Sequence, residues 1–314
     1  MTVTEMMPHA ISGKTCVFHQ ILMATDLSSA SHPALSFGLA LAKGYDANLS
    51  VVHVLLPDWR YEMLAEGALE KLDAHRRLDA DVDSLHPERP VARVVRPASS
   101  VGPALLAVVK ECGADVLLMG THGRDGLSKL AVGSVAEELV RTAPVPVMTV
   151  GPKAAHRAGA PSFQTVVFAT DFGAGSTQAL PLVLRLVHAH DAKLVLVHMI
   201  PPVPAPSSVV SAYAPAVSAA EEVQQWEEAV AKQSRQNLRN WIAGYGQLEH
   251  EPEYVVGTDF LVEGILAAAV QYEAGLIVMG SHQSPSARIS AHFPWSAVHH
   301  VIHDAPCPVL TVAA

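Results

Sequence analysis

Aromatic residues, charged residues and cysteines are all scarce in this 314-residue sequence. Aromatics make up 5% and charged residues 16% of the chain, while half of it is hydrophobic, so Ala, Val and Leu must fill the core. Such a composition is typical of strands that helices cover on both faces. The three cysteines are far apart and form no CxxC pair, which excludes a disulfide framework and a zinc knuckle and favours the reducing cytoplasm.

Two further absences exclude whole classes of protein. No uncharged apolar run reaches about 18 residues, so the sequence predicts no membrane-spanning helix. Residues 1–13 lack the basic start and long apolar core of a signal peptide, and we expect a flexible leader over residues 1–16. The net charge of −9 and the lack of any Lys/Arg-rich run argue against a nucleic-acid partner.

Short apolar segments alternate regularly with amphipathic segments along the chain. In its first half, strands are predicted over 17–25, 47–55, 91–96, 115–119 and 146–150, with helices between them. Ser28 or Ser29 is expected to cap the first helix and Gly44 to end it, and Ser99 or Ser100 is expected to open the helix that ends at Cys112. This alternation predicts parallel βαβ units and an α/β fold.

The same landmarks then occur a second time, in the same order. The run Ala24-Thr25-Asp26 returns as Ala169-Thr170-Asp171, and His53 returns as His198, both 145 positions later. Val116–Gly120 returns as Leu276–Gly280, and Ala143–Val147 returns as Ala305–Val309. Four ordered repeats predict a duplication.

The duplication sets the expected domain organisation. We expect a leader over 1–16, a first domain over 17–153, a linker over 154–162 and a second domain over 163–314. A Pro/Ala/Ser-rich stretch at 201–216 has no counterpart in the first half, and we interpret it as a loop, with a lid over the second site as the alternative.

A proline stands directly before the last strand of each half. Because proline cannot donate to a strand ladder, both strands are predicted to be edge strands. The two edge strands could pair and relate the halves by a pseudo-two-fold axis. The alternative is two independent domains joined only by a linker.

The most informative stretch combines glycines with a strand end and a helix start. Met119-Gly120-Thr121-His122-Gly123-Arg124 follows the fourth predicted strand, and Gly133-Ser134-Val135 opens a predicted helix. Glycine lets backbone pass close to a ligand, and a helix start offers free N–H groups and partial positive charge. We interpret the stretch as a phosphate cradle. It is neither a Walker A loop nor a GxGxxG turn.

Asp26 ends the first strand, so it is expected to face this cradle if the first and fourth strands are neighbours where the strand order reverses. Its carboxylate could then accept hydrogen bonds from a sugar or a base, while the backbone near Val54 reaches the base. Arg124 and Lys129 could screen phosphate charge, and the Ser134 hydroxyl could bind phosphate. The alternative is that Asp26 merely caps the first helix.

The spacing G-x2-G-x9-G-[ST], the Met-Gly-Thr-His-Gly-Arg run, the early Thr-Asp and the closing Ala-Pro-x-Pro-Val together resemble the universal stress protein family. The resemblance covers both halves and implies a tandem-domain member. It implies two Rossmann-like domains of the adenine nucleotide alpha hydrolase-like kind, each a five-stranded parallel sheet of order 3-2-1-4-5 flanked by helices. Pairing through strand five is common in the family, and a homodimer of tandem chains stays open.

Family members with this glycine spacing bind ATP, so the resemblance implies ATP, with or without Mg²⁺, in the first domain. It assigns to the adenosine side Ala24, Thr25, Asp26, Val54 and Met119, and to the phosphate side Gly120, Thr121, His122, Gly123, Gly133, Ser134 and Val135. Alanine at position 24, where the family often has proline, is a departure.

The expected function is that of a cytoplasmic regulatory module in a stress response, with an unidentified signalling partner. A slow ATPase or phosphotransfer enzyme, a structural dimer scaffold without nucleotide and an electron-transfer flavoprotein relative are the alternatives. No catalytic residue and no metal site are predicted.

The second half departs from the glycine pattern. Gln283 replaces the second glycine and Trp295 replaces the third, although Ser296 still matches Ser134. Side chains at those positions predict a weak or absent triphosphate site. His53 and His198 are predicted to be packed, hydrogen-bonded residues, and the run from His299 to His303 is interpreted as a packed or solvated helix face rather than a metal site.

Overall fold

The computed structural model describes residues 16–56, 65–121, 132–155, 163–200, 216–246, 248–258, 260–281 and 295–314. The first half contains β1 (Gln20–Ala24), α1 (His32–Tyr45), β2 (Asn48–Leu55), α2 (Ala65–Ser84), β3 (Val91–Pro97), α3 (Val101–Cys112), β4 (Val116–Gly120), α4 (Ser134–Thr142), β5 (Val147–Val150) and α5 (Pro152–Ala155). The second half contains β6 (Thr165–Ala169), α6 (Ala174–His190), β7 (Lys193–Met199), α7 (Ala216–Ala243), β8 (Glu253–Gly257), α8 (Leu261–Gln271), β9 (Leu276–Ser281), α9 (Trp295–Asp304) and β10 (Val309–Ala313). The leader 1–15 and the 201–215 stretch lie outside the described residues.

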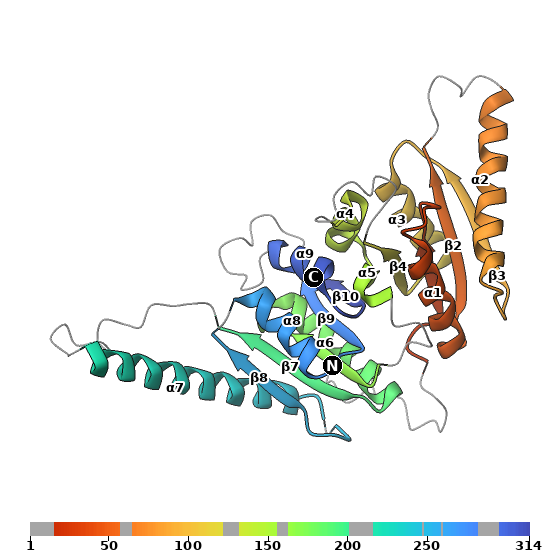
Figure 1. Cartoon of the computed structure of the whole chain (residues 1–314). Helices are drawn as coiled ribbons and strands as arrows, with labels where there is room; N and C mark the ends of the chain where they lie inside the picture. Colours follow the sequence, from red (N-terminus) through yellow and green to blue (C-terminus); the bar gives the residue numbers. More distant parts are fainter. Residues whose placement is uncertain are drawn as a thin grey trace.

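The ten strands of the described residues form one sheet, in the order β3-β2-β1-β4-β5-β10-β9-β6-β7-β8. Within each half the order is 3-2-1-4-5 and every strand pair is parallel, so the predicted α/β fold is confirmed. The two halves lie at opposite ends of the sheet, as Figure 1 shows. Central strands such as β4 and β7 are apolar and buried because helices cover them on both faces.

The edge strands β5 and β10 pair antiparallel and join the halves. Met148 lies opposite Leu310, and both are fully buried. On either side of this pair, the Thr149 hydroxyl donates to the Val309 carbonyl at 3.3 Å and the Thr311 hydroxyl donates to the Val147 carbonyl at 3.1 Å. Equivalent threonines make equivalent bonds in both directions, so a pseudo-two-fold axis passes beside Met148 and Leu310, and the strand-five pairing predicted from the prolines is observed.

Four rings form a second contact on this axis. Tyr45 and His190 are 145 positions apart, as are Phe18 and Phe163, so each pair occupies equivalent places in the two halves. The Tyr45 hydroxyl lies 2.5 Å from Nε2 of His190. Phe18 packs edge-on against Tyr45 with ring centroids 5.4 Å apart, and Phe163 packs against His190 at 4.9 Å. Burial raises the pKa of the Tyr45 phenol, so the hydroxyl stays protonated.

We expect Tyr45→Phe to lower the free energy of unfolding by about 1 kcal/mol, because it removes a half-buried hydrogen bond between the halves and little else. Tyr272→Phe is the matched control, since the Tyr272 hydroxyl makes no hydrogen bond within the described part of the chain. Urea unfolding of both variants measures the difference. Equal midpoints for Tyr45→Phe and the wild type would contradict the importance of this contact.

The ends of α1 differ from the prediction. The N-cap is Ser31 rather than Ser28 or Ser29, because Ser28 is engaged in a turn with Asp26 that precedes the helix. Gly44 does not end α1, which continues to Tyr45. Asp46 is the C-cap with φ of 56°, a left-handed conformation that aspartate adopts more readily than most residues. Ser100 caps α3, as one of the two predicted alternatives.

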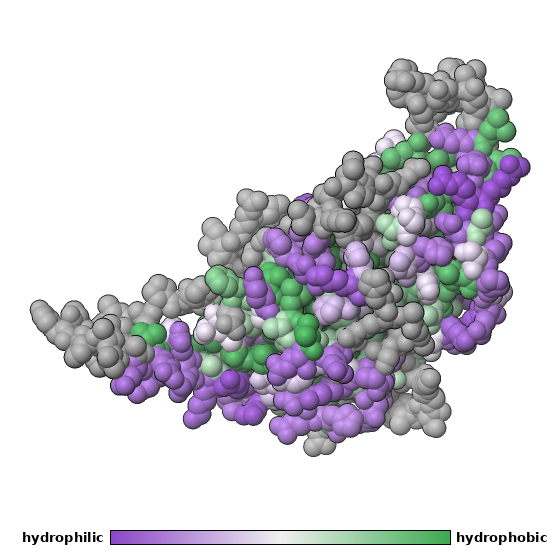
Figure 2. All heavy atoms as spheres, in the orientation of Figure 1, coloured by the Kyte–Doolittle hydropathy of each residue, from purple (hydrophilic) through white to green (hydrophobic). Residues whose placement is uncertain are grey.

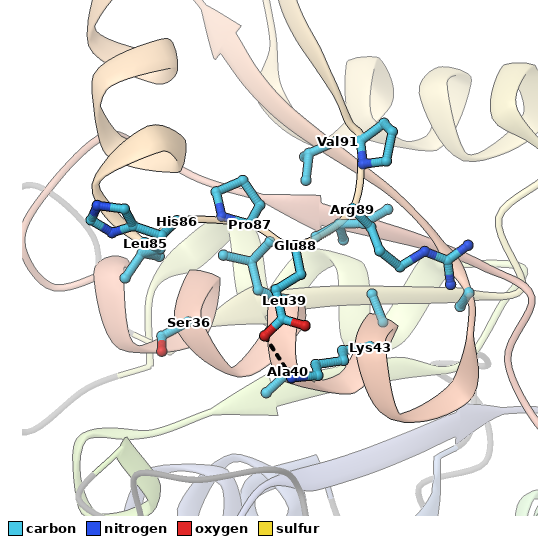
Figure 3. Close-up of a pocket in the computed structure, with 14 residues that line it drawn as sticks. Ser36, Leu39, Ala40, Lys43, Leu85, His86, Pro87, Glu88, Arg89 and Val91 are labelled. Atoms are coloured by element: carbon cyan, nitrogen blue, oxygen red, sulfur yellow. Dashed lines mark hydrogen bonds and ion pairs between the residues drawn. The ribbon is translucent and has the colours of Figure 1, made fainter.

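The outer helices α2 and α7 are rich in charged residues, and Figure 2 shows hydrophilic residues along much of their outer sides. No helix within the described ranges is both long and apolar enough to cross a membrane. A pocket of about 200 Å³ lies between α1 and the segment that joins α2 to β3 (Figure 3). Ion pairs from Lys43 to Glu88 and from Arg89 to Asp46 neutralise the charges around it. It lies at the amino ends of β2 and β3, away from the predicted cradle.

Candidate functional site

The strand register brings the predicted site residues to one level of the sheet. Ala24, the last residue of β1, pairs with Met119 on one side and with Val52 on the other. Two residues further along each strand lie Asp26, Thr121 and Val54. β1 continues to α1 and β2 on one side of the sheet, whereas β4 continues to α4 and β5 on the other. This is the switch point of the first half, where open α/β sheets bind ligands.

Among the described residues, Asp26 has hydrogen-bond partners for only one of its carboxylate oxygens. Its Oδ1 accepts hydrogen bonds from the Ser28 amide at 3.0 Å and from the Ser28 hydroxyl at 2.6 Å. Its Oδ2 is buried and has no hydrogen-bond partner in the described part of the chain. A buried acceptor without a partner costs about 1–3 kcal/mol, so it calls for an explanation. Asp26 does not cap α1, which begins six residues later.

The loop after β1 is held in a strained conformation. Leu27 is buried with φ of 59°, a left-handed value that a branched apolar residue rarely adopts. Its amide donates to the Thr25 hydroxyl at 3.1 Å, and the same hydroxyl lies 2.9 Å from that of Ser31. Strained residues of this kind gather at functional sites and persist only where the surroundings fix them. The Thr25 hydroxyl therefore holds the loop in this conformation, and the amide and hydroxyl of Ser28 fix the orientation of the Asp26 carboxylate.

The N-terminus of α4 supplies the predicted backbone donors. The Gly133 amide donates to the Thr121 carbonyl at 2.8 Å, so this amide does not point to a ligand. The amides of Ser134 and Val135 belong to the first turn of α4 and have no partner within the helix. Ser134 is exposed. The anion-binding donors of the described segment are therefore the amides after Gly133, together with the Ser134 hydroxyl.

Gly133 has no structural need to be glycine. Its φ of −60° suits any residue, and among the described residues an added Cβ would come near only the Thr121 carbonyl oxygen, at an ordinary 3.6 Å. The fold therefore tolerates a small side chain at a position where the sequence has none. The absence of a side chain keeps the space beside the α4 amides open.

The remaining predicted residues divide into two groups. Ala24, Val54 and Met119 are buried at the strand ends, and Gly120 is the last residue of β4. His122, Gly123 and Arg124, as well as Lys129, lie outside the described residues. The structure thus brings together Asp26, Val54, Thr121 and the start of α4, and leaves the middle of the glycine stretch as a prediction.

The second switch point is closed by its own first helix. An added Cβ on Gly280, the counterpart of Gly120, would lie 2.2 Å from the Gly175 carbonyl carbon and 2.3 Å from the Ser176 nitrogen. An added Cβ on Gly175 would lie 2.9 Å from the Ser281 carbonyl oxygen. The first turn of α6 thus packs directly on the backbone at the end of β9.

The first half differs because its first helix begins later. The start of α6, Ala174, corresponds to Ser29 in the first half, whereas α1 begins only at His32. Ala30, the counterpart of Gly175, is exposed, whereas Gly175 is buried. Asp171 is itself buried, and its Oδ1 accepts hydrogen bonds from the Gly173 amide and from the Ser176 hydroxyl, both at 2.8 Å. This closure was not predicted, although the small residues from Gly173 to Ser176 are a signal for close helix packing. Gln283 lies outside the described residues, and Trp295 begins α9.

The histidines of the strand ends have structural partners. His53 donates from Nδ1 to the Thr25 carbonyl at 2.9 Å, and His198 donates to the Thr170 carbonyl at 2.8 Å. Both are buried, as predicted. His299 accepts a hydrogen bond from the Val132 amide at 3.4 Å, and Nδ1 of His303 lies 3.3 Å from Asp304. The two histidines of the predicted helix face therefore point to different partners.

Known protein families and structures match each of the two halves of the chain. The model of the universal stress protein family matches residues 18–151 and again 162–313. A universal stress protein of Thermus aquaticus is 32% identical over 140 residues, which is 43% of this chain and 99% of that protein. One from Methanocaldococcus jannaschii is 28% identical over 43% of this chain and 82% of that protein. These relatives each match about one half of the chain.

A solved structure matches the whole arrangement. The crystal structure of a universal stress protein from Archaeoglobus fulgidus aligns with a TM-score of 0.60 and covers 95% of this chain and 96% of that chain, at 16% identity. At that identity the match shows the fold alone. The fold and the switch points define an α/β protein of the Rossmann-like class. The double match to the family model shows that the chain belongs to the universal stress protein family.

Proposed function

We propose that the chain is an ATP-binding regulatory module of a stress response, with one nucleotide held at the switch point of the first half. The observation that carries the proposal is that Oδ2 of Asp26 is buried and has no hydrogen-bond partner among the residues that the structure describes. A ribose hydroxyl or an adenine amino group would donate to this oxygen and remove the cost of leaving it unsatisfied. Cytoplasmic location and the domain boundaries 17–153 and 163–314 are parts of the same proposal.

The phosphates would bind at the start of α4. The amides of Ser134 and Val135 and the helix dipole favour negative charge there, and the missing side chain at Gly133 leaves room for it. Gly120, Thr121, His122, Gly123 and Arg124 would complete the cradle, with Mg²⁺ accompanying the phosphates. Binding would favour one conformation or assembly of the chain, which an unidentified signalling partner reads.

Gly133→Trp tests the phosphate side, because it copies into the first half the residue found at position 295. We expect ATP affinity to fall at least 100-fold, since the indole would fill the space beside the α4 amides. Isothermal calorimetry with ATP and AMP measures the effect. Gly133→Ala is the control for folding and should melt within about 2 °C of the wild type, since its Cβ has ordinary contacts.

Three results would contradict the proposal. The first is a wild type without ATP binding in the micromolar range, and the second is unchanged affinity in Gly133→Trp. The third is a stoichiometry of two per chain, because α6 closes the second switch point. Phosphate release that requires Asp26 while binding persists would instead favour the slow ATPase alternative.

A further inference from the structure

We infer that the second half acts as a positioning element for the nucleotide site of the first half, chiefly through His299 of α9. The inference rests on the proposed function, and it assigns a role to a half whose own switch point is closed. Three contacts between α9 or β9 and the first half carry it. Two of them reach α4 or the segment directly before it, and the third ties α9 to α5.

The first contact is at the entrance of α4. The Val132 amide donates to Nε2 of His299 at 3.4 Å. The next amide, that of Gly133, donates to the Thr121 carbonyl at 2.8 Å. Two successive amides are therefore bonded to opposite halves of the molecule, one to Thr121 directly after β4 and one to α9 of the second half. Together these two hydrogen bonds fix the start of α4, and so the direction in which the Ser134 and Val135 amides point.

The second contact is at the other end of α4. The hydroxyl of Ser281, a buried residue at the end of β9, donates to the Val140 carbonyl at 3.3 Å. This contact limits movement of α4 along the interface. The helix that presents the anion-binding amides is thus held near both ends by residues of the other half.

The third contact holds α9 itself. The Lys153 ammonium of α5 donates to the Asp304 carboxylate at 3.0 Å, at the last residue of α9. The hydrogen bond from Lys153 lowers the pKa of the Asp304 carboxyl, so this carboxylate stays ionised at neutral pH. His299 therefore projects from a helix that is tied to the first half, and its ring can hold Val132 in place.

The acceptor role of His299 defines the variants. His299→Leu removes the acceptor and keeps an apolar side chain of similar size, whereas His299→Gln restores an acceptor oxygen at the end of the side chain. If His299 only filled space, leucine would do so equally well, and His299→Leu would show no loss for glutamine to restore. His75→Leu is the control, because His75 is a half-buried histidine of α2 whose Nδ1 donates to the Lys71 carbonyl of its own helix.

Two measurements test the inference. In the nucleotide-free protein, amide hydrogen exchange at Val132 should become at least threefold faster in His299→Leu and stay near the wild-type rate in His299→Gln and His75→Leu. In calorimetry, ATP affinity should fall about three- to tenfold in His299→Leu and recover in His299→Gln. Melting temperatures are recorded for all variants, and His299→Gln keeps the test valid if the leucine variant folds poorly.

The outcomes separate the inference from the proposed function. A wild type that binds no ATP overturns the proposed function. The hydrogen-exchange measurement alone then decides whether the Val132 amide is bonded to His299. Unchanged Val132 exchange in His299→Leu overturns the contact. Faster exchange with unchanged ATP affinity overturns the positioning role, as does equal loss of affinity in His299→Leu and His299→Gln.

Discussion

Asp26→Asn is expected to weaken ATP binding about 10- to 150-fold while leaving the fold intact. Asparagine keeps an oxygen for the Ser28 amide and hydroxyl, and these two donors fix its orientation. The second position, where Oδ2 of Asp26 has no partner in the described chain, then becomes an NH₂ group. A donor would face the donors of the nucleoside, and a hydrogen bond to a charged group, worth about 1.5–3 kcal/mol, would be lost.

Asp171→Asn is the matched control. Asp171 occupies the equivalent position, but the packing of α6 on β9 closes its switch point. We expect calorimetry to give the wild-type ATP affinity for this variant, whatever its melting temperature. Wild-type affinity in Asp26→Asn would remove the main support for the nucleotide site, and equal losses in the two variants would place nucleotide in both halves.

Gly280→Ala is expected to destabilise the protein much more than Gly133→Ala does. The Cβ added at position 280 would lie 2.2 Å and 2.3 Å from backbone atoms of Gly175 and Ser176, and backbone cannot rotate away as a flexible side chain can. The start of α6 would have to move off the sheet. We expect a loss of about 3 kcal/mol in the free energy of unfolding and a fall in melting temperature on the order of 5–10 °C.

Differential scanning calorimetry measures this effect against Gly133→Ala, the same substitution where the nearest atom is 3.6 Å away. Comparing the two variants distinguishes Gly280, where close packing requires glycine, from Gly133, where the packing also allows alanine. Similar melting temperatures for both variants would show that α6 is not seated on β9 as described.

Much of the fold could be predicted because the repeat supplied each landmark twice. The prolines before β5 and β10 indicated edge strands, and those edges pair with each other. Asp26, Val54 and Thr121 could be placed together because parallel strands end at one edge of a sheet, and the register confirms that they share a level.

Details that depend on where a helix begins could not be predicted. Serine is frequent at helix starts, and Ser28, Ser29 and Ser31 compete for the cap of α1, so only the engagement of Ser28 by Asp26 decides between them. The closure of the second switch point has the same origin. The sequence shows Asp171 repeated after β6, but whether α6 begins early enough to reach β9 depends on backbone packing between segments about 100 residues apart in the chain.

The ring cluster on the pseudo-two-fold axis separates a fused chain from an assembly of two identical chains. On a true two-fold axis every side chain meets its own copy, so position 45 would face a second tyrosine and a mutation would change both sides at once. Here a tyrosine meets a histidine at 2.5 Å. Fusion lets selection act on the two sides of the axis independently. One side of such an interface can acquire a donor while the other acquires an acceptor, and one half can keep an open ligand site while its twin loses one.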